Sequence, residues 1–170
     1  LRTAPTGFDT VLLVNSGTEA VDLALKLATL FTARRDVIAL REGYHGWSQA
    51  ADAVSTSAFD NPQALSSRPD WVHIADTPHP YRGVHRGAGS APAYVDDLRK
   101  LMSDLAGAGR APAAYIAEPV LGNAGGVVPP PGYVSGAYEA VRAHGAVVIS
   151  DEVQVGLGRL GPDFWGCLHQ

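Results

Sequence analysis

The residues best suited to chemistry follow the stretch from Ala146 to Ser150. This mostly apolar run is typical of a buried strand, and the acidic pair Asp151-Glu152 comes directly after it. A carboxylate at a strand end can hold magnesium, pair with the protonated ring nitrogen of a cofactor, or cap the strand and face solvent. The sequence has no P-loop that would supply the phosphate partner of a magnesium site. The other two interpretations stay open.

A second group of polar residues, Ser16-Gly17-Thr18, precedes an apolar stretch over 20–31 that predicts a largely buried helix. Two hydroxyls, a glycine and the free N–H groups of a helix N-terminus suit the binding of a phosphate. The same serine, together with Glu19, also has the spacing of a capping box, which would only satisfy the end of the helix. Both interpretations are compatible with these residues.

Two further strands end at distinctive residues. The run 37–40 leads into Tyr44-His45-Gly46-Trp47, an aromatic cluster that could stack on a flat ring or simply pack beneath a loop. The run 114–117 ends at Glu118-Pro119. The other histidines do not have the spacing of metal ligands, so we expect no metal site.

The elements that must position these residues are short apolar strands alternating with helices. Strands are expected over 11–14, 37–40, 71–75, 114–117 and 146–150, and helices over 20–31, 94–106 and 133–144. This alternation predicts an α/β fold with a mostly parallel sheet and helices on both faces. Ligands of such sheets bind beyond the carboxyl ends of the strands, where the four polar groups should therefore meet.

Composition excludes several classes of protein. The chain has 170 residues, of which 46% are hydrophobic, so it can bury the core of one domain. Its longest apolar runs are much shorter than the roughly 20 residues that span a bilayer, and no membrane association is expected. A net charge of −4 with scattered charges argues against binding to nucleic acid. A single cysteine, Cys167, fits a reducing compartment, and we expect a cytoplasmic protein.

A glycine pattern over 156–161 offers a competing interpretation. It fits G-x-G-x-x-G, so a dinucleotide-binding oxidoreductase is an alternative. However, the expected strand and the first glycine are separated by 151–155, and Pro162 stands where the helix of that motif should begin. The match is therefore a weak signal.

Taken together, the strand-end sequences resemble the class III (ornithine/4-aminobutyrate type) aminotransferases of the pyridoxal phosphate (PLP) fold type I. The resemblance is carried by the segments 15–20, 44–46, 117–120 with 125–126, and 151–154 with Gly156, Gly158 and Arg159. It implies PLP as cofactor, the large domain of that fold in incomplete form, small-molecule amine or amino acid and oxo substrates, and a homodimer.

The resemblance also implies roles for eight residues around the cofactor. One group would hold its phosphate: Ser16, Gly17 and Thr18. Another would contact its ring, with Tyr44 and Val153 on opposite faces, Asp151 at the ring nitrogen, Gln154 at the phenolic oxygen, and Glu118 near the ring and substrate. His45 is expected only to shape its loop.

Two departures from the family pattern affect the expected reaction. Val155 stands where the family commonly has threonine, and with the segment 80–83 this suggests relatives of the phospholyase and alanine–glyoxylate branches. A PLP-dependent phospholyase, which would eliminate phosphate from a phosphoamine, is therefore an alternative to an aminotransferase.

The second departure concerns the Schiff-base lysine. The two lysines, Lys26 and Lys100, lie within expected helices and not at a strand end. We therefore expect residues 1–170 to be the first part of the large PLP-binding domain. The catalytic lysine, the small domain and the strands between the last strand and the first would lie elsewhere in a longer protein. The chain alone is then expected to be inactive, and a non-catalytic fragment is a further alternative.

Overall fold

Four short strands form one parallel sheet in the computed structural model, which describes residues 3–169. They are β1 (Val37–Leu40), β2 (Val72–Ala75), β3 (Ala114–Ala117) and β4 (Val147–Ser150), arranged in the order β2-β1-β3-β4. All three pairings are parallel, so the carboxyl ends of the strands share one edge. The predicted α/β class with a parallel sheet is confirmed.

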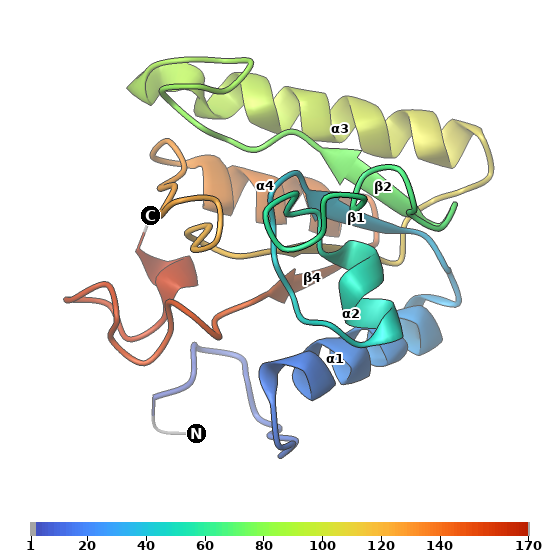
Figure 1. The fold of residues 1–170 in the computed structure, drawn as a ribbon, viewed down its shortest axis with the longest axis horizontal. Coiled ribbons are helices and arrows are strands. Elements are labelled where there is room, and N and C mark those ends of the chain that lie inside the picture. The colour runs from blue at the N-terminus through green and yellow to red at the C-terminus, as the bar shows by residue number, and fades with distance from the viewer. Residues whose placement is uncertain (1–2, 170) are drawn as a thin grey trace.

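Helices cover both faces of the sheet (Figure 1). On one side lie α1 (Gly17–Thr32) and the short α2 (Gln49–Val54), and on the other lie α3 (Ala91–Gly107) and α4 (Tyr133–Ala143). Successive side chains of β1 alternate between these layers. Val37 and Ala39 pack with α1 and α2, whereas Ile38 and Leu40 pack with α3 and α4. The strands read as continuous apolar runs because both faces are buried.

The helix boundaries follow local signals in the sequence. α3 begins three residues before the predicted start because Pro92 occupies its first turn, where a missing backbone N–H costs nothing. The start of α4 was predicted correctly. α2 was not predicted, because six residues are too few to show a helical period. Its start is marked by Ser48, whose Oγ accepts a hydrogen bond from the Ala51 N–H.

The predicted strand over 11–14 is wrong. These residues belong to no strand and are exposed, with Leu13 retaining 92% of its accessible surface. A strand needs a hydrogen-bonded neighbour, and among residues 3–169 no strand pairs with this segment. The expectation that α1 is largely buried is also wrong, since Leu30 and Phe31 on its outer side are mostly exposed.

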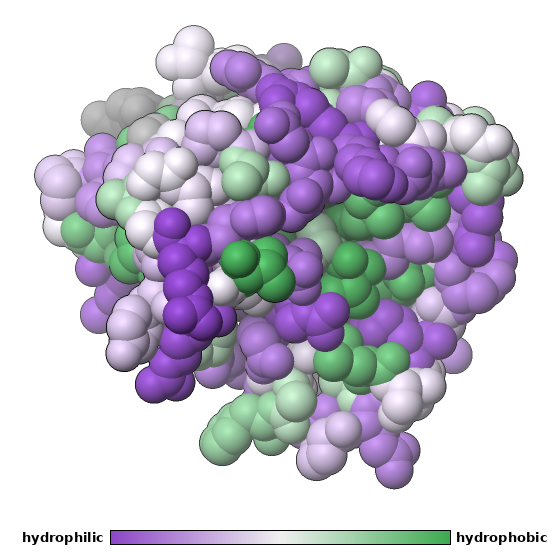
Figure 2. Space-filling view, turned by 90° about the horizontal axis from the view of Figure 1, so that it is seen from above, coloured by the Kyte–Doolittle hydropathy of each residue, from purple (hydrophilic) through white to green (hydrophobic). Residues whose placement is uncertain are grey.

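The outer surface of α3 is polar. Viewed from above in Figure 2, the molecule shows mostly hydrophilic residues with separate hydrophobic patches. Exposed ion pairs join Arg99 to Asp96 and Lys100 to Asp104 along this helix. Within residues 3–169, no helix is both long and apolar enough to cross a membrane.

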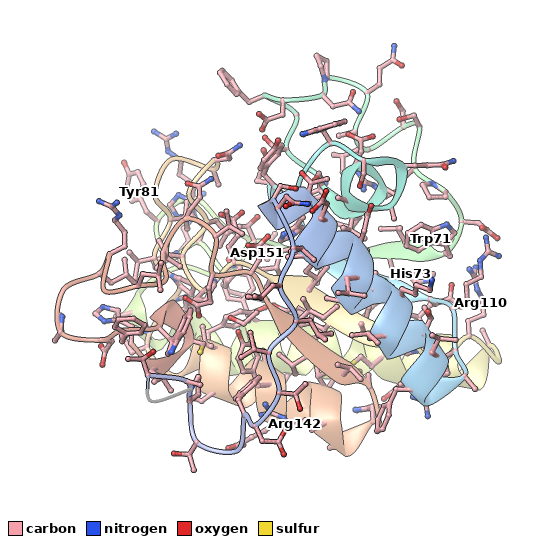
Figure 3. The ribbon with its side chains drawn as sticks, turned by 90° about the horizontal axis from the view of Figure 1, so that it is seen from below. Trp71, His73, Tyr81, Arg110, Arg142 and Asp151 are labelled. Atoms are coloured by element: carbon pink, nitrogen blue, oxygen red, sulfur yellow. The ribbon has the colours of Figure 1, made fainter. Side chains whose placement is uncertain are left out.

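An ion-pair cluster lies at the amino edge of the sheet, on the side labelled by His73 and Arg110 in Figure 3. The carboxylate of Asp36, just before β1, is buried and accepts hydrogen bonds from His73 Nε2 at 3.0 Å and Arg110 Nη2 at 2.6 Å. Burial alone would raise the pKa of this carboxyl group. The hydrogen bonds and charges of the two partners outweigh burial and lower the pKa below its usual value.

This lowered pKa predicts a specific acid sensitivity. Stabilisation from ionised Asp36 is complete above the ordinary aspartate pKa, near 4, and is lost as the pH falls through the lower folded-state value. We expect Asp36→Asn to unfold at a lower urea concentration than the wild-type protein at pH 7. The difference between the two urea midpoints should narrow below about pH 4. Asp104→Asn, at an exposed pair, should change little at either pH. An equal decrease in the urea midpoint of Asp36→Asn at both pH values would contradict the lowered pKa of Asp36.

Candidate functional site

The loops that follow β1, β3 and β4 meet the first turn of α1 at the carboxyl edge of the sheet. Figure 3 shows Asp151, which follows β4, beside the first turn of α1, while His73 and Arg110 lie on the far side of the molecule. The predicted convergence is therefore observed for the three groups that follow β1, β3 and β4. Ser16-Gly17-Thr18 lies beside them at the start of α1, but it does not follow a strand as predicted.

The first turn of α1 forms the predicted cap. Ser16 Oγ accepts a hydrogen bond from the Glu19 N–H at 3.2 Å, and Glu19 Oε2 accepts one from the Asn15 N–H at 2.6 Å. Capping uses the Glu19 N–H, and the earlier N–H groups of the helix, at Gly17 and Thr18, have no acceptor within the helix. The cap and an anion site are thus compatible, because they use different N–H groups.

Two glycines allow this helix end to touch the neighbouring loops. A Cβ at Gly17 would lie 2.8 Å from Val153 Cγ2, and a Cβ at Gly46 would meet the side chain of Thr18. Gly46 also has φ = +122°, a backbone conformation that favours glycine. The loops after β1 and β4 therefore both lie against the start of α1.

Asp151 is held in a buried pair with His45. Its Oδ2 accepts a hydrogen bond from His45 Nδ1 at 2.8 Å, and its Oδ1 accepts one from the Val153 N–H at 3.1 Å. The histidine side chain is fully buried, and its other ring nitrogen, Nε2, has no hydrogen-bond partner. An ionised carboxylate only accepts hydrogen bonds, so Nδ1 is the donor in this pair.

His45 thus has a larger part in the site than the sequence indicated. Loop shaping was the only role expected of it, yet it contacts the residue best suited to pair with a ring nitrogen. The two residues lie 106 positions apart, and no spacing in a single sequence connects them. Only the β1-β3-β4 strand order brings them together.

Glu118 joins two of the strand-end loops. Its Oε1 accepts a hydrogen bond from the Tyr44 N–H at 3.0 Å, and its Oε2 accepts one from the Gly122 N–H at 2.9 Å. The side chain is buried, and burial raises the pKa of this carboxyl group although the two hydrogen bonds oppose the change. Glu118 therefore fixes the backbone of the loops after β1 and β3.

The remaining predicted residues lie nearer the surface. Tyr44 is half-buried, whereas Val153 and Gln154 are exposed at the open side of the site. Trp47, which the sequence grouped with Tyr44, is 80% exposed and does not pack in an aromatic cluster. Arg159, which is among the residues that carry the resemblance, is also exposed.

Neither lysine of the chain lies at this site. Lys26 is exposed in the second half of α1, and Lys100 on α3 pairs with Asp104 at 2.6 Å on the opposite layer. The expectation that Lys26 lies within a buried helix is wrong, because that side of α1 faces solvent. The conclusion that neither residue ends a strand is confirmed.

The glycine pattern over 156–161 does not form a dinucleotide-binding turn. These residues form successive turns, and Gly158 donates its N–H to the Phe164 carbonyl oxygen at 2.9 Å. The next helical element is the three-residue η2 (Gly166–Leu168), held by Glu152, whose carboxylate accepts N–H groups from Gly166 and Cys167. A dinucleotide fold would need a full helix directly after the glycines.

Comparison with known proteins agrees with this geometry. The family model described as Aminotransferase class-III matches residues 1–170. The ethanolamine-phosphate phospho-lyase homolog 1 of Caenorhabditis elegans is 39% identical over 181 aligned positions, covering 100% of this chain and 38% of that protein. The alanine–glyoxylate aminotransferase 2-like protein of Drosophila melanogaster is 41% identical, covering 89% of this chain and 32% of that protein.

A solved structure gives the same result. An amine transaminase from an uncultivated Pseudomonas species, in its PLP-bound form, superimposes with a TM-score of 0.76 at 32% identity, covering 90% of this chain and 36% of that one. The chain thus spans less than half the length of the relatives it matches. The family predicted from the strand-end sequences is confirmed: the chain belongs to the class III aminotransferases.

Proposed function

We propose that residues 1–170 form the first part of the large PLP-binding domain of a longer enzyme, called here the parent enzyme. That enzyme would transfer an amino group between an amine or amino acid and an oxo acid or aldehyde. Two findings support the proposal: the family match covers the whole chain, and the chain aligns with less than half of each relative described above.

The observation that carries the proposal is the contact between the start of α1 and the loop after β4. The small separation of Gly17 from Val153 means that a group bound at the helix N-terminus lies next to the segment containing Asp151. A phosphate on a short arm from a pyridine ring has this shape. The residues therefore fit PLP, with an anion site, an apolar side chain and a buried carboxylate in adjacent positions.

Individual residues would hold separate parts of PLP. Ser16, Gly17 and Thr18 would bind the phosphate through N–H and hydroxyl groups. Tyr44 and Val153 would cover the two faces of the ring. The remaining contacts would be polar, with Asp151 at the ring nitrogen, Gln154 at the phenolic oxygen, and Glu118 near the ring and the substrate.

When bound, PLP supplies an electron sink for negative charge that develops on the substrate carbon. The role proposed for this chain is to keep the ring able to accept that charge. Asp151 would hold a proton on the ring nitrogen, and His45 would orient its carboxylate. Glu118 would keep the loops after β1 and β3 in place beneath the ring.

The covalent partner of PLP would be a lysine outside residues 1–170. Neither Lys26 nor Lys100 is near Asp151, and Lys100 is already paired with Asp104. The proposal is tested by adding PLP to the parent enzyme, reducing the complex with borohydride, and mapping the modified peptide. Modification of a lysine outside this chain, with amino transfer to an oxo acid, would support it. Absence of a PLP absorbance band, or a stable adduct on Lys26 or Lys100, would refute it.

A phospholyase is the second candidate, favoured by the similarity to the Caenorhabditis elegans phospho-lyase homolog over the whole chain. The same PLP site would serve both reactions. Val155, which prompted this alternative, is buried against Gly166, so its contribution is to packing near η2. Release of inorganic phosphate from phosphoethanolamine, compared with formation of an amino acid from an oxo acid, distinguishes the two activities.

The Gly17 contact gives a prediction about PLP affinity. We expect Gly17→Val in the parent enzyme to weaken PLP binding by at least about tenfold, because its side chain would displace Val153 and block approach to the helix N–H groups. Gly107→Ala, at the end of α3 with no atom within 4 Å of the added methyl group, is the control and should bind PLP normally. Unchanged affinity in Gly17→Val would exclude the proposed phosphate position.

We also propose that the parent enzyme is a cytoplasmic homodimer. The single, unpaired Cys167 supports a reducing compartment. Leu13, Leu30 and Phe31 leave apolar surface exposed that further protein could cover. Light scattering of the parent enzyme tests the homodimer, and a monomeric mass would contradict it. Cell fractionation tests the cytoplasmic location, and a mitochondrial location would contradict it.

A further inference from the structure

Three polar side chains from three separate loops form a chain of hydrogen bonds that ends at Gln154. Gln154 Nε2 donates to Asn123 Oδ1 at 2.8 Å, and Asn123 Nδ2 donates to Asp60 Oδ2 at 2.9 Å. Asp60 lies between α2 and β2, Asn123 lies between β3 and α4, and Gln154 follows β4. We call these three residues the amide relay.

The acidic end of the relay determines the direction of every hydrogen bond in it. An ionised carboxylate only accepts hydrogen bonds, so Asp60 requires the NH₂ group of Asn123. The oxygen of Asn123 must then face Gln154, and it can bond only to the NH₂ group of that residue. A free glutamine could present either end of its amide, but the relay selects one.

The loop that carries Asn123 is held in place by backbone hydrogen bonds, so it can orient the amide of Gln154. At its base, Leu121 and Val127 exchange two backbone hydrogen bonds, each 3.0 Å long. The Gly122 N–H also donates to the buried Glu118. Asn123 therefore projects from a closed turn whose position is fixed by the hydrogen bond from Gly122 to Glu118.

Gly122 restricts the other side of the Gln154 amide. A Cβ at this position would overlap Gln154 Oε1, so the amide packs directly on the glycine backbone. With Oε1 against Gly122 and one N–H bonded to Asn123, the second N–H of Nε2 is the group that remains for another acceptor. The hydrogen bond to Asn123 and the contact with Gly122 thus favour one position and one polarity of the exposed amide.

We propose that Asn123, oriented by Asp60, is a positioning residue that makes Gln154 present an N–H group to the phenolic oxygen of PLP. This inference rests on the proposed function, because it requires Gln154 to contact that oxygen. The N–H group would favour the ionised form of the oxygen. A reversed amide would place two acceptors together and disfavour that form.

The test uses the parent enzyme loaded with PLP and follows the visible absorbance of the bound cofactor against pH. Asn123→Leu should move the transition of the phenolic oxygen upward by about half to one pH unit and weaken PLP binding by about 3- to 10-fold, the loss expected for one hydrogen bond. Asn61→Ala, in the same loop as Asp60 but outside the relay, is the control and should match wild type.

A charge exchange separates positioning from simple loop stability. In the double variant Asp60→Asn with Asn123→Asp, the new amide can donate to the new carboxylate, which still accepts from Gln154 Nε2. We expect this pair to restore the wild-type pH profile, whereas Asn123→Asp alone faces the repulsion of Asp60. If Asn123→Leu fails to fold, Asp60→Asn alone should give a smaller shift in the same direction.

The outcomes distinguish failure of this inference from failure of the proposed function on which it rests. Wild-type enzyme that shows no PLP absorbance would overturn the proposed function, and the role of the relay with it. If the wild-type enzyme binds PLP, two results would overturn only the role given to the amide relay. One is a pH profile of Asn123→Leu that coincides with the wild-type profile. The other is a shift in Asn123→Leu that the charge exchange does not reverse.

Discussion

Asp151→Asn in the parent enzyme is expected to reduce turnover by on the order of 10²-fold or more while some PLP binding remains. Asparagine has nearly the same shape, and its oxygen can still accept the Val153 N–H. It carries no negative charge, however, and cannot hold a proton on the ring nitrogen. The electron sink would be weakened, whereas the phosphate contacts at the start of α1 would stay intact.

Steady-state turnover and PLP titration of the same samples check this prediction. Asp104→Asn removes a carboxylate from the exposed surface of α3 and should leave both quantities unchanged. Near wild-type turnover in Asp151→Asn would contradict the role given to this carboxylate. Loss of all PLP binding would show instead that the substitution disrupts the site as a whole.

His45→Leu is expected to produce the largest loss of stability among single substitutions at the site. It would leave the buried Asp151 carboxylate without its side-chain hydrogen-bond donor, a loss that costs about 1–3 kcal/mol for a buried polar group and more for a charged one. Urea unfolding of the parent enzyme, followed by tryptophan fluorescence, measures the change. PLP binding should weaken as well, because the orientation of the carboxylate is no longer fixed.

Two variants make this result specific. His45→Asn can place an N–H group near the position of Nδ1 and should recover part of the loss. His85→Leu removes a histidine that pairs with Asp97 at 2.6 Å on the surface, where the expected cost is below about 1 kcal/mol. Equal destabilisation by His45→Leu and His85→Leu would show that the buried pair has no special importance.

The fold was predictable wherever local patterns determine structure. Strand β3 matched the sequence prediction because 114–117 is a continuous apolar run that ends before Glu118-Pro119. The start of α4 matched because three prolines and Gly132 directly precede it. The strand over 11–14 has an equally apolar pattern, yet it is exposed. An apolar run shows that a segment can be a strand, but pairing depends on a neighbour that the same residues do not specify.

The site was predictable as a set of strand ends but not as a set of contacts. Topology alone places Glu118 and Asp151 at one edge, since parallel strands end on the same side, whereas Ser16 follows no strand and reaches this edge as the N-cap of α1. The pairing of His45 with Asp151 and the relay from Asp60 to Gln154 depend on side chains from separate loops. Their mutual geometry is set by packing, which leaves no periodic signal in the chain.

The most direct test of the central claim is the NMR resonance of the pyridine nitrogen in isotopically labelled PLP bound to the parent enzyme. The resonance reports whether this nitrogen carries a proton. We predict a protonated nitrogen in the wild-type enzyme and an unprotonated one in Asp151→Asn at the same pH. An unprotonated nitrogen in the wild-type enzyme, with PLP bound, would contradict the assignment of this strand-end site.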